Sequence, residues 1–190
     1  MIGSRGQWGK SLLYEDSPGI PLIMTGMDIP ENQVCRTPVS LVDLYPTILG
    51  SVACSSVSQK STSLPGQSLY DIMDGDYDSE RIVFSEYHAY GAPSAAFMLR
   101  KGSFKYIHYV GYEPELFDLE IDPQELTNLA FEEGYRDIIK EFEGHLRDLI
   151  DPGEVDLQAR RAQALLVEKF GGIDKALQSG TQAETPAPKI

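Results

Sequence analysis

The sequence lacks a long hydrophobic run, because no stretch of about 20 apolar residues, the length that spans a bilayer, occurs in it. No transmembrane helix is therefore expected. Residues 1–10 also lack the apolar stretch of a secretory signal peptide. These absences favour a cytoplasmic location and leave the compartment otherwise open.

Basic side chains are scarce, since 16 Lys and Arg stand against 29 Asp and Glu, for a formal net charge of −13. Binding to a phosphate backbone or to an anionic membrane needs clustered Lys and Arg. We therefore expect no nucleic-acid partner and no membrane partner. The acidity of the chain is better explained by solubility.

Cysteine and self-contained catalytic motifs are scarce too. The two cysteines, Cys35 and Cys54, form no CxxC pair and have no nearby His, so a metal cage is not indicated. A disulfide between them stays open, although two free thiols are the simpler expectation. The acidic stretch 71–78 lacks the EF-hand spacing. No G-x-S-x-G, Walker loop or G-x-G-x-x-G occurs.

The first half of the chain predicts one strand and one helix. The apolar run at residues 20–25 (IPLIMT) is typical of a buried strand. Residues 41–49 have apolar positions at helical spacing after Ser40, a plausible N-cap, and Pro46 predicts a kink or a late start. The Ser- and Thr-rich residues 51–66 are expected to form a surface loop.

The second half predicts a sheet followed by helices. Short β-branched and aromatic runs separated by Gly or Pro lie at residues 81–87, 96–100, 104–109 and 115–119. Their short connections predict an antiparallel sheet. An amphipathic helix at 135–150 should cover one face of that sheet, and a second helix should run over 154–170 to Gly171-Gly172. The expected unit is α+β.

Two side chains are candidate ligand contacts by position alone. His88 follows a predicted strand and precedes a glycine-containing loop, where binding residues commonly lie. A structural loop histidine with a backbone partner is the alternative. Lys10 follows Trp8-Gly9, and a lysine in such a place is ordinarily just solvated. Neither residue alone identifies a reaction.

A series of motifs in a fixed order is more specific than any one residue. The motifs are Trp8-Gly9-Lys10 with Tyr14-Glu15, IPLI at 20–23, VSLVDLYPT at 39–47, GQSL at 66–69, FSEY at 84–87, YEPELFDL at 112–119, Asp122-Pro123 and ELTNL at 125–129. The series covers about residues 1 to 130 and resembles the sulfatase family. It is most similar to bacterial enzymes of the choline-sulfatase-like and aryl-sulfatase-like kind.

This resemblance implies a fold and its domain limits. Sulfatases have an α/β fold of the alkaline-phosphatase-like type, in which a small C-terminal subdomain carries a four-stranded antiparallel sheet packed by a helix. Residues 1–75 would then be the C-terminal remnant of the α/β domain, and 76–152 the subdomain. Residues 153–177 are expected to form an extra helix, and 178–190 a disordered tail.

The resemblance also implies a chemistry for which this sequence lacks the main parts. Family members hydrolyse sulfate esters with a formylglycine nucleophile and a divalent cation, usually calcium. The C/S-x-P-x-R motif that yields formylglycine is missing, because Cys35-Arg36-Thr37-Pro38 has its proline one place too late. The aspartates and the D-H-G or D-N-G segment that hold the metal are absent as well. No metal ligand is therefore expected in this chain.

Some site residues nevertheless carry over. Lys10 matches the family lysine that reaches the sulfate oxygens, so the resemblance implies a catalytic role for it. For His88 it implies a contact in the substrate pocket. Glu15, Asp43 and Asp118 match the family but are interpreted as structural, the two aspartates as caps of backbone donors.

We therefore expect the C-terminal fragment of a sulfuric ester hydrolase, inactive alone, whose partners are a missing N-terminal sulfatase region and a small sulfate ester. Apolar surface around Leu22 and Met24 should be exposed without that region. The C-terminal helices could also serve a homo-oligomer. Two alternatives remain: a stand-alone binding or oligomerisation module, and part of a phosphonate or phosphate ester hydrolase of the same superfamily.

Overall fold

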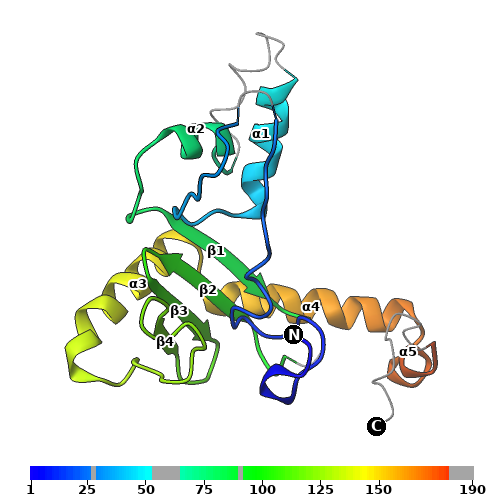
Figure 1. Ribbon diagram of the computed structural model, residues 1–190. Coiled ribbons are helices and arrows are strands. Elements are labelled where there is room, and N and C mark those ends of the chain that lie inside the picture. Colours follow the sequence, from blue (N-terminus) through cyan, green and yellow to red (C-terminus); the bar gives the residue numbers. More distant parts are fainter. Residues whose placement is uncertain (27–28, 53–64, 90–91, 180–190) are drawn as a thin grey trace.

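The computed structural model describes residues 1–26, 29–52, 65–89 and 92–179. Figure 1 shows a helical lobe standing on a sheet, and further helices behind that sheet. Cys54, most of the predicted loop at 51–66 and the predicted tail from residue 180 onward lie outside the described residues.

The sheet has four antiparallel strands in the order β1-β2-β3-β4. The strands are β1 (Ile82–Tyr87), β2 (Ala96–Lys101), β3 (Phe104–Tyr109) and β4 (Glu115–Asp118). A tight turn joins β2 to β3, where Lys101 pairs with Phe104 and Gly102 takes a positive φ of 56°. The sheet predicted from the sequence is confirmed.

The two faces of the sheet have different covers because side chains alternate along each strand. One face packs against α3 (Arg136–Leu149), where Phe97, Tyr106 and Leu116 meet Phe142 and Leu146. Burial of each such side chain contributes about 1.5–3 kcal/mol. The helix predicted at 135–150 therefore covers the sheet as expected.

The opposite face is covered by the N-terminal segment instead of a helix. Leu13 is buried there against Met98, Ile107 and Phe117. The residues before it are mostly exposed and include a short 3-10 turn, η1 (Ser4–Gly6). This arrangement places Lys10 beside the strands on the face opposite α3.

The upper lobe in Figure 1 is built from η2 (Leu41–Asp43), α1 (Leu44–Ser51) and α2 (Leu69–Asp74). Asp43 is fully buried and accepts hydrogen bonds from the backbone N–H groups of Ser40 at 2.7 Å and Gln67 at 2.8 Å. The structural role expected for Asp43 is confirmed. The α-helix begins late, at Leu44, so that Pro46 falls in its first turn, where a missing N–H costs nothing.

The strand predicted at residues 20–25 is wrong, because these residues form no regular structure. A strand needs a neighbour to accept and donate its backbone hydrogen bonds, and no described segment lies in that position. The side chains of Leu22 and Ile23 are 44% and 89% exposed. The expected exposure at Leu22 is thus confirmed, whereas Met24 is half-buried.

Residues 152–179, the last that the structure describes, hold two helices where the sequence predicted one. Helix α4 (Pro152–Lys169) is preceded by its N-cap Asp151, whose side chain accepts from two backbone N–H groups, and α5 (Ile173–Ser179) follows Gly171-Gly172. Figure 1 shows α4 extending past the sheet, and residues 161–170 are exposed apart from the half-buried Val167. No helix among the described residues is long and apolar enough to cross a membrane.

Candidate functional site

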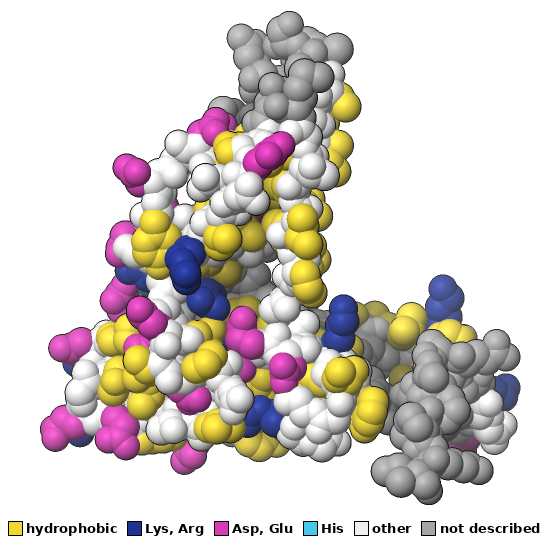
Figure 2. Space-filling view, in the orientation of Figure 1, with side chains coloured by type: hydrophobic (Ala, Val, Ile, Leu, Met, Phe, Trp, Pro, Cys, Tyr) yellow, Lys and Arg dark blue, Asp and Glu magenta, His cyan; other side chains and the backbone are white. Residues whose placement is uncertain are grey.

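A cavity of about 540 Å³ lies between the N-terminal segment, the start of the upper lobe, the edge strand β1 and its neighbour β2. Its wall holds three basic side chains, Lys10, Arg36 and Arg100, and one acidic side chain, Glu15. Figure 2 shows basic side chains beside the hollow between the upper lobe and the sheet. The cavity is the one place in the described residues where the sparse positive charge of this acidic chain converges with a candidate catalytic lysine.

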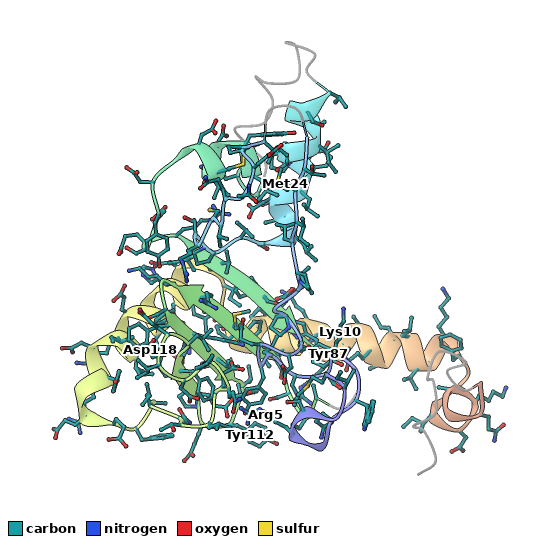
Figure 3. The ribbon with its side chains drawn as sticks, in the orientation of Figure 1. Arg5, Lys10, Met24, Tyr87, Tyr112 and Asp118 are labelled. Atoms are coloured by element: carbon teal, nitrogen blue, oxygen red, sulfur yellow. The ribbon has the colours of Figure 1, made fainter. Side chains whose placement is uncertain are left out.

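Lys10 is exposed and forms no hydrogen bond or ion pair with the described residues. Figure 3 shows it on the N-terminal segment, next to the sheet. Arg36 is likewise exposed and free of hydrogen-bond and ion-pair partners within the described part of the chain. Their charges are therefore available to a ligand anion, and charge-assisted hydrogen bonds are among the stronger kind.

Arg100 is held more firmly than the other two cations. Its Nε donates to the carbonyl oxygen of Gly102 at 3.3 Å, and its Nη1 lies 3.6 Å from Glu15 Oε2. The same Glu15 accepts a hydrogen bond from Lys105 Nζ at 3.0 Å. Glu15 is thus shared between two cations, and the structural role expected for it is consistent with these contacts.

Below the cavity lies a buried ion pair. Lys105 is fully buried, and its Nζ lies 2.7 Å from Oε1 of Glu125, which is 3% exposed. Buried charges persist in proteins when they are paired and hydrogen-bonded. The pair neutralises itself, so the cavity wall keeps the excess of positive charge supplied by Lys10 and Arg36.

Two phenols beside this network are structural. Tyr14 and Tyr109 donate hydrogen bonds to the two carboxylate oxygens of Glu115, at 2.6 and 2.8 Å. Burial first, and Glu115 second, raise the pKa of both phenols above their ordinary value. They therefore stay protonated at neutral pH and cannot serve as bases.

The structure does not bring His88 together with Lys10. The His88 ring packs edge-on against Phe97, on the α3 face of the sheet, with 5.4 Å between ring centroids. Its Nε2 lies 3.3 Å from Glu86 Oε2, and its backbone carbonyl accepts from Gln163 of α4. The substrate contact predicted for His88 stays a prediction, and its contacts favour holding α4 on the sheet.

Sequence reasoning missed Arg36, Arg100, Lys105 and Glu125. A signal existed for two of them, because Arg100 and Lys105 stand directly opposite each other on β2 and β3. Like charges in cross-strand positions repel unless acidic partners face them. The pattern therefore predicts nearby carboxylates, although only the tertiary structure shows that these are Glu15 and Glu125.

No metal centre is found in the described residues, since no group of three or more His, Cys, Asp or Glu could hold an ion there. The acidic stretch 71–78 includes no such group either. The residues of this part of the chain do not fit the calcium ion that the resemblance implies. Any such ion must take its ligands from other residues.

The chain is similar to proteins of known families. The family described as N-sulphoglucosamine sulphohydrolase, C-terminal, matches residues 3–152. Arylsulfatase K from Mus musculus is 34% identical over 156 residues, which cover 76% of this chain and 27% of that protein. Choline-sulfatase from Rhizobium meliloti (strain 1021) is 37% identical over 131 residues, covering 68% and 25%.

A solved structure of a 2-O GAG sulfatase aligns with a TM-score of 0.48 at 30% identity, covering 62% of this chain and 26% of that one. The chain spans about a quarter of the length of the curated relatives it matches.

Proposed function

The chain belongs to the sulfatase family, matching its C-terminal part, and we propose that it supplies one wall of the sulfate pocket of a sulfuric ester hydrolase. Lys10 would donate a hydrogen bond to an oxygen of the sulfate group. Arg36 and Arg100 would add positive potential on the other sides of the same cavity. The observation that carries this proposal is the convergence of these three cations in one cavity.

The proposed chemistry uses that charge in two ways. A sulfate monoester is an anion, and a hydrogen bond from an ammonium group to it contributes about 1.5–3 kcal/mol. Cleavage of the S–O bond also leaves negative charge on the departing oxygen, which a preorganised cation stabilises. The formylglycine nucleophile and the calcium ligands implied by the resemblance would come from an N-terminal sulfatase region.

The apolar surface of the upper lobe supports docking of such a region. A second hollow, of about 920 Å³, is lined mostly by apolar side chains, including Leu22, Ile23 and Val34. Contiguous exposed apolar surface usually marks an interaction site. We propose that residues 1–75 complete an α/β domain there, while 76–152 form the subdomain, 153–177 an additional helical part and 178–190 a tail.

For His88 the sequence-based role remains a separate proposal, because the residue does not line the cation-rich cavity. A place on the alcohol side of the substrate would be compatible with its strand-end position. Its test is independent of the test for Lys10.

The proposal is tested by assembling an active enzyme around this chain. The chain alone, with an aryl sulfate and calcium, should give no turnover above background. A chimera in which it replaces the matching C-terminal part of the choline-sulfatase should release sulfate. In that chimera Lys10→Met should lower kcat/KM by about 10- to 100-fold, while Lys140→Met, at an exposed lysine on α3, should not.

Two results would contradict the proposal. A folded, active chimera in which Lys10→Met behaves like Lys140→Met would remove Lys10 from the site. Faster hydrolysis of an aryl phosphate than of the matched aryl sulfate would favour the phosphate-ester alternative.

A further inference from the structure

We propose that Glu125 is a positioning residue that fixes the chain segment carrying Lys10. The inference deepens the proposed function and rests on it for the role of Lys10. It follows from three contacts that a single residue, placed in the loop after β4, makes with the N-terminal segment and with the sheet.

The first two contacts bracket Lys10 in the sequence. The Glu125 side chain accepts a hydrogen bond from the backbone N–H of Glu15, with Oε2 at 2.7 Å. The Glu125 backbone carbonyl accepts one from Arg5 Nη2. Lys10 lies midway between Arg5 and Glu15 in the sequence. Glu125 thus contacts the chain on both sides of the candidate catalytic lysine, and on the Arg5 side it shares the contact with Gln124, whose carbonyl oxygen accepts from Arg5 Nη2 at 2.9 Å.

The third contact fixes Glu125 itself. Its Oε1 pairs with Lys105, whose Nζ is fully buried in β3 and also donates to Glu15 at 3.0 Å. The sheet, Glu125 and Glu15 are therefore joined in one closed set of ionic contacts. Because Lys105 and Glu125 are both buried, water screens the contact between them little.

The other polar attachments of the Lys10 segment are exposed hydrogen bonds, in which the Met1 ammonium donates to the carbonyl oxygens of Gly9 at 2.8 Å and Asp16 at 3.1 Å. Among residues 1–12 none is buried, and Leu13 is the first side chain to enter the core. Arg5 also stacks on the Tyr14 ring, with its guanidinium carbon 3.8 Å from the ring centroid. Figure 3 shows Arg5 and Lys10 on this same segment. Without the Glu125 carboxylate, the segment would be held by Leu13, Tyr14 and hydrogen bonds to backbone carbonyl oxygens alone.

Glu125 has an unfavourable backbone conformation, which its contacts can offset. Its φ is +54°, in the left-handed region that a side chain rarely adopts. Strained residues persist where the surrounding structure over-determines them, and they cluster at functional sites. Glycine would suit this conformation better, but it would lose both carboxylate contacts.

The test uses the full chain and its one tryptophan, Trp8, which lies two residues before Lys10 and is 58% exposed. Glu125→Gly keeps the backbone conformation and removes the carboxylate. We expect lower Trp8 fluorescence anisotropy and amide exchange about tenfold faster over residues 5–15. Glu120→Gly, at an exposed site of the same loop, is the matched control. Unchanged anisotropy and exchange in folded Glu125→Gly would overturn the proposal.

Two further variants keep the proposal testable if the Glu125→Gly chain does not fold. Arg5→Met removes the hydrogen bonds to the carbonyl oxygens of Gln124 and Glu125, on one side of Lys10, and it should raise Trp8 mobility. The double change Lys105→Met with Glu125→Gln removes both buried charges but keeps an acceptor for the Glu15 N–H, so Trp8 should stay rigid. Mobility that rises in the double variant but not in Arg5→Met would contradict the role assigned to Glu125.

Binding of inorganic sulfate separates this inference from the proposed function. If both hold, Glu125→Gly weakens sulfate binding in the wild-type background but causes no further loss when Lys10→Met is already present. A merely structural effect would lower binding equally in both backgrounds and would overturn positioning. If Lys10→Met leaves sulfate binding unchanged, the proposed function is wrong. The Trp8 anisotropy and the amide exchange would then still test whether Glu125 holds the segment that carries Lys10.

Discussion

The buried carboxylate of Asp43 and the guanidinium of Arg81 form a salt bridge, in which Arg81 Nη2 lies 2.7 Å from both Asp43 oxygens. Asp43 belongs to the upper lobe, and Arg81 directly precedes β1. The Arg81 Nε also donates to the carbonyl oxygen of Pro38 at 2.8 Å. This pair therefore joins the lobe to the sheet and shapes the cavity between them.

Asp43→Ala should destabilise the chain by about 3–5 kcal/mol, the usual cost of leaving one member of a buried pair without its partner. It also removes the acceptor for the N–H groups of Ser40 and Gln67. Urea unfolding followed by circular dichroism measures the effect. Asp137→Ala, at a 97% exposed side chain paired with Lys140, is the control and should cost less than about 1 kcal/mol. Equal effects would contradict the role of Asp43.

Gly66→Ala should destabilise the lobe by more than the roughly 1–2 kcal/mol that left-handed backbone costs a side chain. The φ of Gly66 is +92°, and an added Cβ would lie 2.5 Å from the Val42 carbonyl oxygen. Gly134→Ala is the control, because a Cβ there meets nothing within 4 Å. Thermal unfolding of the two variants compares them, and a Gly66→Ala chain as stable as the control would refute the close approach.

The pH dependence of stability should include a contribution from Glu143. Burial opposes its ionisation, but hydrogen bonds from Tyr106 and His108 outweigh burial and hold the pKa of Glu143 below its ordinary 4.5. A folded-state pKa below the unfolded value means that the contribution is present above about pH 4.5 and is lost as the pH falls through the lower value.

Glu143→Gln should therefore flatten the stability curve below about pH 4.5, while it lowers stability at neutral pH. Unfolding free energies measured between acid and neutral pH give this comparison. A variant that keeps the full acid dependence of the wild-type chain would show that other carboxylates cause it.

The apolar hollow of the upper lobe should bind a hydrophobic fluorescent dye. Ile23→Asn, at an 89% exposed side chain that lines the hollow, should reduce the dye signal. Ile121→Asn changes a 72% exposed isoleucine outside that hollow and should leave the signal unchanged. Equal reductions would show that dye binding is not located in the hollow.

His88→Ala should loosen α4, because it removes the ring contact with Phe97 and the ionic contact with Glu86. Faster amide exchange in the first half of α4 is the expected result. The substrate role predicted from the sequence has a different signature: a raised KM in the active chimera with unchanged exchange in α4.

The sheet and α3 could be predicted because their patterns are local. Strands of β-branched and aromatic residues lie one after another with short turns, and the apolar stripe from Ile138 to Leu146 has a clear helical period. Residues 20–25 have an equally apolar pattern, but a strand also needs a partner strand, and local sequence carries no information on that. Helix α5 was not predicted, because it is short and follows Gly171-Gly172, which indicated the end of a helix.

Only the site residue that lies in a recognisable sequence motif could be predicted. Lys10 came from the resemblance, whereas Arg36 and Arg100 reach the same cavity from segments far apart in sequence. The connection from Lys105 through Glu125 to Glu15 depends on a loop conformation with a positive φ at a non-glycine residue. Such a conformation opposes the local preference of the residue, so sequence reasoning cannot anticipate it.

The exposed half of α4 makes the chain selectively vulnerable to proteases. Residues 161–170 gain little from tertiary packing, and a helix of that length is marginal in water without such packing. Local unfolding should therefore present Arg161 and Lys169 to trypsin well before the basic residues of the sheet. Brief digestion should leave a resistant body that ends near residue 161 and retains the sheet, the cation-rich cavity and the Glu125 contacts, a shorter chain suited to crystallisation.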